Sequence, residues 1–384
     1  MGWHQYYMKI ARLNAIKVRE QSAQLYVPKD CFPDPHHCMV FYNPAMEFSR
    51  TISSIALQAL KPRLPKNPKI LDGLCATGAR GVRYYLEAGK ARVTFNDANE
   101  LAIAFAKKNA ALNKLRGATF SSKDFHVEAA TSHDYDFVEL DPFGTPTNFL
   151  DSAIRACARN AVLSVTATDL ANLCGARPKP CIREYDAVPS HNYYCHETAL
   201  RILIGRVVRS AAVHANAFTP LVSFYSGHHI KTIGSLTPSA KAADEAYSKV
   251  GTLGFCRKCF AFHQNALACK KCGSALEKCG PLWLGRTSDG ATLSQMLVIS
   301  RKSRHATAAH SDFIRLLLGE NDFAPGYLDL HELCSANKKP VAKKTEAIMG
   351  ILRSKGFAVS RTHYAPTGLK TDAPAFELLK IASG

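Results

Sequence analysis

Long apolar runs, internal repeats and low-complexity tracts are all missing from this chain of 384 residues. No apolar run approaches the 18 residues that a membrane-spanning helix requires, so we expect no membrane segment. The basic N-terminal stretch lacks the apolar core and the small-residue cleavage site of a secretory signal. The 13 cysteines form an odd, scattered set, which is typical of a reducing compartment rather than of a disulfide framework. We therefore expect a cytoplasmic protein.

Acidic residues are scarce relative to basic ones. Lys and Arg number 49 against 31 Asp and Glu, which gives a net charge of +18. Residues 201–384 carry 25 basic and 12 acidic side chains, and therefore +13 of that charge. A basic solvated surface can produce such a bias, but a polyanion partner exploits it through phosphate neutralisation and counterion release. The charge therefore indicates a nucleic-acid partner that binds chiefly to the C-terminal half.

From residue 69 onward the chain alternates short apolar strands with helices. The expected strands cover residues 69–72, 92–95, 137–140 and 161–166. The expected helices cover residues 79–88, 101–112 and 149–158, and an earlier helix covers 45–60. Alternation of this kind predicts βαβ units around a parallel sheet, with ligands at the carboxyl ends of the strands.

The regular alternation fades after about residue 215. We therefore predict an α/β protein in which residues 1–215 hold an N-terminal segment and a Rossmann-like sheet. Residues 216–384 are expected to form a basic C-terminal α+β domain. The boundary is expected near residues 210–220.

A loop of small residues follows the first expected strand and runs from Gly73 to Gly78. Its spacing is not GxGxxG, so it fits a dinucleotide pyrophosphate poorly. A loop for S-adenosylmethionine needs no phosphate nest, only room for the methionyl and ribose groups. Asp97 ends the next strand, where a carboxylate can accept two hydrogen bonds from ribose hydroxyls. Taken alone, these residues fit equally well a tight turn in which Asp97 caps the next helix.

The tetrapeptide Asp141-Pro142-Phe143-Gly144 follows the strand expected at 137–140. An exocyclic amine is a poor nucleophile because its lone pair is delocalised, and a neighbouring carboxylate can orient it and take its proton. Asp141 supplies that acceptor, the backbone carbonyl of Pro142 assists it, and Phe143 can stack on a base. The alternative is an Asp-Pro turn that begins a helix. With the small-residue loop on the same sheet edge, amine methylation is the better hypothesis.

Two CxxC pairs stand nine residues apart in the C-terminal half. They are Cys256, Cys259, Cys269 and Cys272. Four thiolates at this spacing can converge on Zn²⁺ in a closed, structural site, so we predict a zinc ribbon inserted at about residues 252–280. Every residue inside the two pairs is basic, which would present cations to phosphates.

Together the motifs resemble those of the tRNA (guanine-26-N2) dimethyltransferases of archaea and eukaryotes, and the length suits the archaeal form. The resemblance covers about residues 23–376. It rests on the following segments: Phe41-Tyr42-Asn43-Pro44 with Arg50, the loop at 71–81, Asn96-Asp97, residues 141–144, 166–169, 173–176 and 361–374. It implies transfer of methyl groups from S-adenosylmethionine to N2 of a guanine in tRNA, expected at position 26, giving N2-methyl- and N2,N2-dimethylguanosine.

Residue by residue, the resemblance implies four contacts to S-adenosylmethionine. They are Arg50, Arg80, Asp97 and Asp124. It also implies that Asp141 is the catalytic acceptor and that Phe41 and Phe143 sandwich the guanine. Phe125 departs from the family, where a small residue tends to follow the acidic one, and Cys75 stands where a hydroxyl is common.

Two other functions stay open at the level of sequence. One is a different nucleic-acid amino-methyltransferase, although its motif usually has Pro and then an aromatic residue where Phe143 and Gly144 stand. The other is a zinc-ribbon RNA-binding protein with an inactive methyltransferase domain, which the presence of Arg50, Asp97 and Asp141 disfavours. We expect a monomer.

Overall fold

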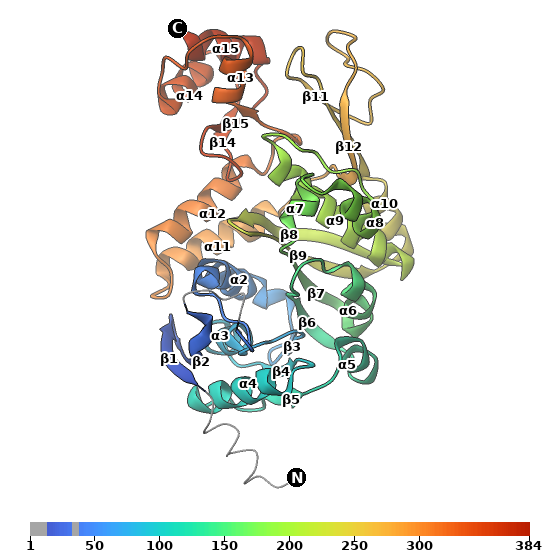
Figure 1. The fold of residues 1–384 in the computed structure, drawn as a ribbon, viewed down its shortest axis with the longest axis vertical. Helices are drawn as coiled ribbons and strands as arrows, with labels where there is room; N and C mark the ends of the chain where they lie inside the picture. Colours follow the sequence, from blue (N-terminus) through green and yellow to red (C-terminus); the bar gives the residue numbers. More distant parts are fainter. Residues whose placement is uncertain (1–13, 33–37) are drawn as a thin grey trace. The chain divides into compact units, whose positions relative to one another are not determined.

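The computed structural model describes residues 14–32 and 38–384 and divides into two compact units (Figure 1). The first unit extends to Pro142 and adds residues 149–165 and 295–311. The second comprises residues 143–148, 166–294 and 312–384. Residues 1–13 and 33–37 lie outside the described residues. None of the described helices has the length and apolarity that crossing a membrane requires.

A parallel sheet forms the centre of the first unit. Its strands are five of the seven in a larger sheet and follow the order β5-β4-β3-β6-β7, in which each neighbouring pair is parallel. Their bounds are Lys69–Asp72 for β3, Arg92–Asn96 for β4, Thr119–Ser121 for β5, Tyr135–Leu140 for β6 and Cys157–Ala167 for β7. The predicted Rossmann-like α/β class is thus confirmed. Strand β5 was not foreseen, because three residues are too few to show a pattern.

Helices cover both faces of this sheet (Figure 1). One face carries α2 (Glu47–Leu60), α3 (Ala79–Ala88) and α4 (Glu100–Leu112), and the other carries α5 (Phe125–Thr131) and α6 (Leu150–Ala156). The expected helix at 79–88 has the bounds that the structure gives α3. The side chain of Asn99 caps α4 by accepting a hydrogen bond from the Leu101 amide. Asp97 is therefore not the helix cap that the alternative interpretation required.

A buried ion cluster ties the N-terminal hairpin to two of these helices. The hairpin pairs β1 (Ala15–Glu20) with β2 (Ala23–Pro28). Glu20, 1% exposed, accepts hydrogen bonds from Arg50 of α2 at 2.7 and 2.6 Å and from Arg83 of α3 at 2.9 Å. Burial raises the pKa of Glu20, but Arg50 and Arg83 outweigh it and hold that pKa at about 2. The cluster therefore ties the hairpin to α2 and to α3, the helix that follows the loop at residues 73–78.

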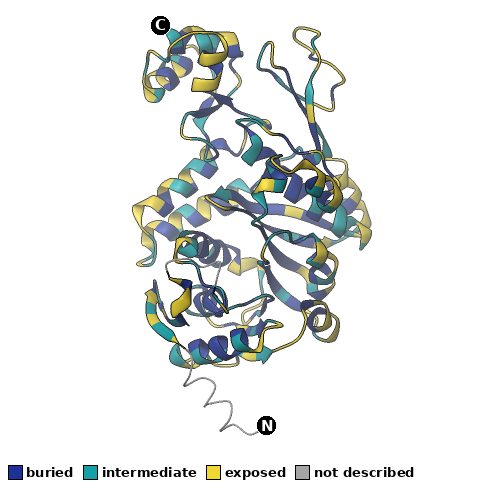
Figure 2. Ribbon diagram, viewed as in Figure 1, coloured by how far each residue is buried: buried dark blue, intermediate teal, exposed yellow. Residues whose placement is uncertain are grey.

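The second unit is built around α9 (Cys195–Val213), which is mostly buried (Figure 2). Helix α9 packs against β8 (Asn216–Ser226) and β12 (Glu277–Trp283), and β8 forms an antiparallel hairpin with β9 (His229–Pro238). Smaller elements of this unit are α7 (Leu170–Leu173), α8 (Pro178–Tyr185) and α10 (Ala240–Tyr247). Helix α9 packs on elements of the second unit, to which residues 166–294 belong. The domain boundary expected near residues 210–220 stays a prediction.

Two three-stranded antiparallel sheets complete the second unit. One has the order β11-β10-β12, with β10 at Val250–Phe255 and β11 at Phe262–Gln264. The other has the order β13-β15-β14. Its strands and the helices beside it are β13 (Leu328–Asp329), α13 (Leu330–Ala336), α14 (Thr345–Ser354), β14 (Val359–Arg361), β15 (Gly368–Thr371) and α15 (Ala375–Ser383). The predicted C-terminal α+β architecture with an inserted ribbon is confirmed.

Helices α11 (Gly290–Lys302) and α12 (Ala308–Glu320) each belong partly to both units, since residues 295–311 group with the first.

In the second unit, Glu197 of α9 binds Lys370 of β15 at 2.8 Å and Arg201 at 2.9 Å. All three residues are buried. This cluster joins the C-terminal sheet to the central helix of its unit.

Cys31 and Cys38 form a disulfide next to the N-terminal hairpin. The scattered cysteine pattern did not indicate this pair, which is an exception to the reduced state that we expected throughout. The other eleven cysteines are free thiols in the structure.

The first prediction concerns the stability that Glu20 provides. We expect Glu20→Gln to lower the free energy of unfolding at pH 7 by about 3 kcal/mol, because a pKa lowered from 4.5 to about 2 stabilises the folded state by roughly that amount. The wild-type protein should lose the same contribution as the pH falls from about 4.5 towards 2, where the folded state must also take up the proton. Urea denaturation at several pH values measures this. The exposed Glu100→Gln is the control, and equal midpoints for wild type and Glu20→Gln at pH 7 would contradict the prediction.

Candidate active site and metal centre

The loop between β3 and α3 is wound tightly against the end of β4. The Cys75 amide donates to the Asn96 carbonyl at 2.9 Å, and the Asn96 side chain donates to the Gly73 carbonyl at 2.9 Å. Gly78 has a φ of +74°, and a Cβ there would lie 3.0 Å from the Cβ of Ala106. Only glycine fits this backbone without strain, because the left-handed region and the close helix both exclude a side chain. The loop thus has a fixed shape at the carboxyl edge of the sheet.

Asp97 follows β4 at the same edge and is half-buried. Its Oδ2 accepts a hydrogen bond from the Ala76 amide at 2.9 Å, and its Oδ1 accepts one from the Asn99 amide at 2.9 Å. A carboxylate oxygen has two lone pairs, so each oxygen can accept a further hydrogen bond from a hydroxyl group. The two amides hold the carboxylate in place beside the loop.

Arg50 and Asp124, the other expected cofactor contacts, have different surroundings. The Nε and Nη2 groups of Arg50 bind Glu20, and Nη2 also donates to the Asn43 carbonyl at 3.0 Å. Asp124 follows β5, is exposed, and caps α5 by accepting from the His126 amide at 2.8 Å. Their contact with a cofactor stays a prediction.

Asp141 follows β6, next to β3 in the sheet, where the Gly73 amide donates to the Glu139 carbonyl at 3.1 Å. Its Oδ2 accepts a hydrogen bond from Arg80 Nη2 at 2.7 Å. Arg80 also lies 3.5 Å from Glu139 Oε1 and donates to Ser53 Oγ at 3.2 Å. The Arg80 side chain is 6% exposed and that of Asp141 is 23% exposed. Arg80 thus holds Asp141 at the edge of the sheet, and its contact with a cofactor stays a prediction.

Further buried acids surround this ion pair. Tyr84 donates its hydroxyl to Glu139 Oε2 at 2.6 Å. Asp72, at the end of β3, accepts from the Gly81 amide at 2.9 Å. Burial and the neighbouring Glu139 raise the pKa of Asp72 to about 7. One guanidinium group therefore lies among three carboxylates, and the burial of the acids favours the neutral form of one of them.

The tetrapeptide does not begin a helix, because the next helical turn starts only at Thr147. Asp141 and Pro142 group with the first unit and Phe143 with the second. The Phe143 side chain is 72% exposed, which is unusual for so large an apolar group. The Gly144 amide donates to Thr168 Oγ1 at 2.7 Å, and the Thr168 amide donates to the Gly144 carbonyl at 3.0 Å. These two bonds fix the backbone immediately after Phe143. Phe41, the other expected base-stacking residue, is half-buried in the first unit.

Within the first unit, two carboxylates therefore follow β4 and β6, on either side of β3 and its glycine-rich loop. This arrangement can bind hydroxyl groups at Asp97 and accept a proton at Asp141, which is partly open to solvent.

Comparison with known proteins identifies the family. The model of the N2,N2-dimethylguanosine tRNA methyltransferase family matches residues 16–383. The chain belongs to that family.

Individual relatives agree along nearly the whole chain. The tRNA (guanine(26)-N(2))-dimethyltransferase of Methanothermobacter thermautotrophicus is 36% identical over 380 residues, covering 96% of this chain and 99% of the relative. The enzyme of the same name from Pyrococcus abyssi is 35% identical over 387 residues, covering 97% and 99%. The structure of Trm1 from Pyrococcus horikoshii in complex with S-adenosyl-L-methionine superposes with a TM-score of 0.84 at 32% identity, covering 96% of this chain and 100% of that one. The resemblance inferred from the sequence motifs is confirmed.

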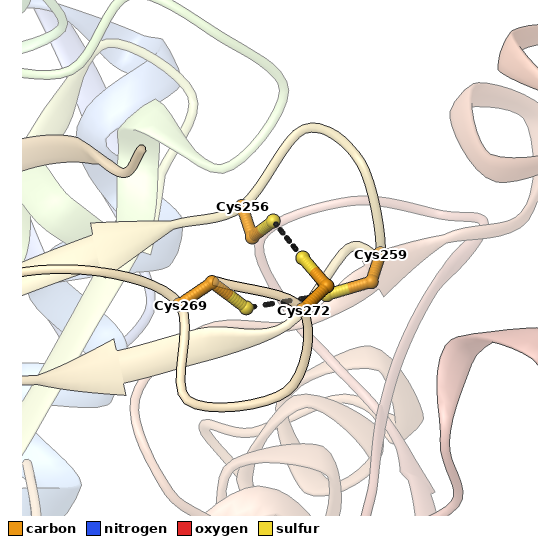
Figure 3. Close-up of side chains that lie close together, drawn as sticks. All are labelled: Cys256, Cys259, Cys269 and Cys272. Atoms are coloured by element: carbon orange, nitrogen blue, oxygen red, sulfur yellow. Dashed lines mark hydrogen bonds between the residues drawn. The ribbon is translucent and has the colours of Figure 1, made fainter. Parts of the chain in front are cut away.

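The four cysteines of this family member converge as predicted (Figure 3). Cys256 Sγ lies 3.5 Å from Cys272 Sγ, Cys259 Sγ lies 3.4 Å from Cys269 Sγ, and Cys259 and Cys272 are 3.7 Å apart. Four thiolates bound at about 2.3 Å to a tetrahedral metal would be about 3.8 Å apart, so the set fits such an ion. The two CxxC pairs, here called the knuckles, lie on the turns of the β11-β10-β12 sheet.

Several groups at these sites were not found by sequence reasoning. His263 Nε2 lies 3.2 Å from Cys269 Sγ, beside the four cysteines. Glu139 and Ser53 bind Arg80, and Thr168 holds Gly144. Glu139 had one visible signal, since it is a charged residue within an apolar strand. The others depend on contacts between distant segments.

The second prediction concerns the shape of the glycine loop. We expect Gly78→Ala to lower the free energy of unfolding by about 1–2 kcal/mol, the cost of a left-handed conformation for a residue with a Cβ. The control is Gly350→Ala in α14, where an added Cβ meets nothing within 4 Å. This change should instead stabilise the protein by about 0.5–1 kcal/mol, because alanine favours a helix. Thermal unfolding of both variants measures the contrast, and a Gly78→Ala protein at least as stable as the wild type would show that backbone strain at Gly78 is not decisive.

Proposed function

We propose that this protein is an S-adenosylmethionine-dependent tRNA methyltransferase that acts on the exocyclic N2 of a guanine, the one that its relatives' names place at position 26. Membership of the N2,N2-dimethylguanosine tRNA methyltransferase family supports the reaction, as does the relative solved with S-adenosylmethionine. The observation that carries the proposal is the position of Asp141, which follows β6 beside the glycine loop and is held there by Arg80. The products are N2-methyl- and N2,N2-dimethylguanosine.

In this proposal the loop at residues 73–78 would hold the cofactor. The fixed loop leaves backbone at the sheet edge without bulky side chains, and Asp97 accepts hydrogen bonds from the ribose hydroxyls. Arg50 contributes its Nη1 group, which forms no hydrogen bond within the described part of the chain. Arg80 of α3 and Asp124, the residue before α5, would be further contacts to the cofactor. S-adenosylmethionine supplies an electrophilic methyl group.

Asp141 performs the proton chemistry. The guanine N2 amine donates a hydrogen bond to the Asp141 carboxylate, which localises the nitrogen lone pair and turns it towards the methyl group. As the N–C bond forms, Asp141 accepts the amine proton and passes it to solvent, to which its side chain is 23% exposed. The Pro142 carbonyl is a second acceptor. Phe143 provides a stacking surface for the guanine, consistent with its exposure, and Phe41 is the proposed second surface.

The substrate RNA binds to the basic second half of the chain. Residues 201–384 carry 25 of the 49 basic residues and only 12 of the acidic ones, which favours phosphate contacts. The exposed knuckle residues Arg257, Lys258, Lys270 and Lys271 add four cations around the cysteine cluster. A structural Zn²⁺ bound by Cys256, Cys259, Cys269 and Cys272 would fix their positions.

The third prediction separates catalysis from cofactor binding. Asp141→Asn should lower the rate of methyl transfer to tRNA by about 10²- to 10⁴-fold, the usual loss for a general base, while S-adenosylmethionine still binds. Asp97→Ala should instead raise the cofactor KM first, because its ribose contacts are the same in the ground and transition states. Transfer of a labelled methyl group and nucleoside mass spectrometry measure both effects. The exposed Asp134→Asn is the matched control, and near-normal turnover by Asp141→Asn would move the catalytic acceptor elsewhere.

The fourth prediction concerns zinc. Cys256→Ser should remove one equivalent of zinc per chain and lower the midpoint of thermal unfolding, because metal binding contributes directly to folding. Cys279→Ser should retain the metal, since that buried thiol lies outside the cluster. Elemental analysis of freshly purified protein gives the stoichiometry. An unchanged zinc content in Cys256→Ser would refute the assignment.

A further inference from the structure

A second group of soft metal ligands lies in the second unit, away from the paired CxxC motifs. It consists of Cys174, Cys195 and His196, whose ligand atoms all lie within 4.8 Å of one another. Among the described residues, only this set and the four knuckle cysteines bring three or more such ligands together. Tetrahedral ligands of zinc lie about 3.3–3.8 Å apart, so small rotations of the three side chains would close the set on one ion.

The backbone around these residues is held in place from both sides. Cys174 directly follows α7, and Cys195 and His196 are the first two residues of α9. Gly175 has a φ of +82°, and a Cβ there would lie 2.9 Å from the Cβ of His191, so the turn after Cys174 fits closely against the segment before α9. The His191 ring also lies at hydrogen-bond distance, 3.0 Å, from the Cys174 carbonyl. The two cysteines therefore face each other across a fixed turn.

The third ligand is oriented by an aromatic neighbour. The His196 ring stacks on Tyr225 of β8, with ring centroids 4.1 Å apart and planes 14° apart. The Tyr225 amide donates to His363 Nε2 at 3.0 Å, which anchors this part of β8 to the segment before β15. A stacked imidazole keeps one plane, so its nitrogen stays near the two sulfur atoms without a change in the backbone.

We propose that Cys174, Cys195 and His196 bind a second Zn²⁺ ion. Two thiolates neutralise the charge of the ion, one imidazole completes a three-residue set, and the fourth position is left for water or an exogenous ligand. Binding releases the two thiol protons to solvent, and no redox step is involved. The two sulfurs remain free thiols in the structure, in contrast to Cys31 and Cys38, which form a disulfide.

The ion would connect two elements that matter for the tetrapeptide. Cys174 closes the short helix α7, which begins one residue after Asp169 and two after Thr168. Thr168 in turn holds the backbone of Gly144 through two hydrogen bonds. A metal between α7 and α9 would therefore stabilise the turn on which residues 143–148 rest. The metal site itself does not depend on the proposed reaction.

Metal stoichiometry of the full-length protein tests this site. The protein is purified without oxygen, incubated with Zn²⁺, desalted and analysed for zinc by mass spectrometry. We expect two zinc ions per chain in the wild type and one each in Cys174→Ser, Cys195→Ser and His196→Ala. Cys181→Ser, which changes a neighbouring buried cysteine outside the set, should keep both ions. Combining Cys195→Ser with Cys256→Ser should remove both.

Cobalt substitution gives an independent measurement that does not require the cysteine variants to fold. The absorption of the Co²⁺-loaded protein should contain a four-sulfur component and a second component with two sulfurs and one nitrogen, and His196→Ala should lose only the second. One zinc ion per wild-type chain after loading would overturn the proposal. So would a zinc content that is unchanged in His196→Ala, or alkylation showing that Cys174 and Cys195 are joined by a disulfide.

Discussion

The buried guanidinium group of Arg80 connects the cofactor loop to the proposed catalytic acceptor. It binds Asp141 at 2.7 Å and lies 3.5 Å from Glu139, and removing one partner from such a buried set costs about 3–5 kcal/mol. Arg80 is the second residue of α3, so its position follows from the loop that ends at Gly78. Gly81 lets α3 approach β4, because a Cβ there would lie 2.5 Å from Phe95. One strand–helix turn thus shapes the proposed cofactor seat and positions Asp141.

Each unit uses a buried glutamate to join segments that are distant in sequence. Glu20 joins the N-terminal hairpin to α2 and α3, and Glu197 joins α9 to β15. Burial raises the pKa of Glu197, but Lys370 and Arg201 outweigh it and lower that pKa to about 2. Apolar packing tolerates small shifts between elements, whereas a buried carboxylate with two cationic partners requires one arrangement. The clusters therefore specify where α3 and α9 lie, and both helices begin at candidate sites.

The elements predicted best from the sequence are those with a local signal. Helix α3 shows a clear apolar face, the strands before Asp72 and Asp141 are short apolar runs, and the paired CxxC spacing indicates a metal ligand set without any knowledge of the fold. Partners brought together by folding have no such signal. Arg80 and Asp141 are 61 residues apart, and Cys174 lies 21 residues from Cys195. The sequence motifs single out Arg80 and Asp141 for separate roles, but nothing local to either segment indicates that the two side chains pair. Cys174 and Cys195 likewise carry no local sign of their proximity.

The contact between Arg80 and Asp141 also bears on how a carboxylate, which is a weak base, can accept a proton from an amine. A neighbouring guanidinium group favours the ionised form of a carboxylate, which is the form that can take up a proton. Free carboxylates are far less basic than an aliphatic amine, but the nitrogen loses its proton readily once the methyl group has made it cationic. The acceptor must therefore be ionised and well placed rather than strongly basic. The buried Arg80 side chain holds one side of the Asp141 carboxylate in place. The Asp141 side chain is also partly exposed, so a proton that it accepts can pass to solvent.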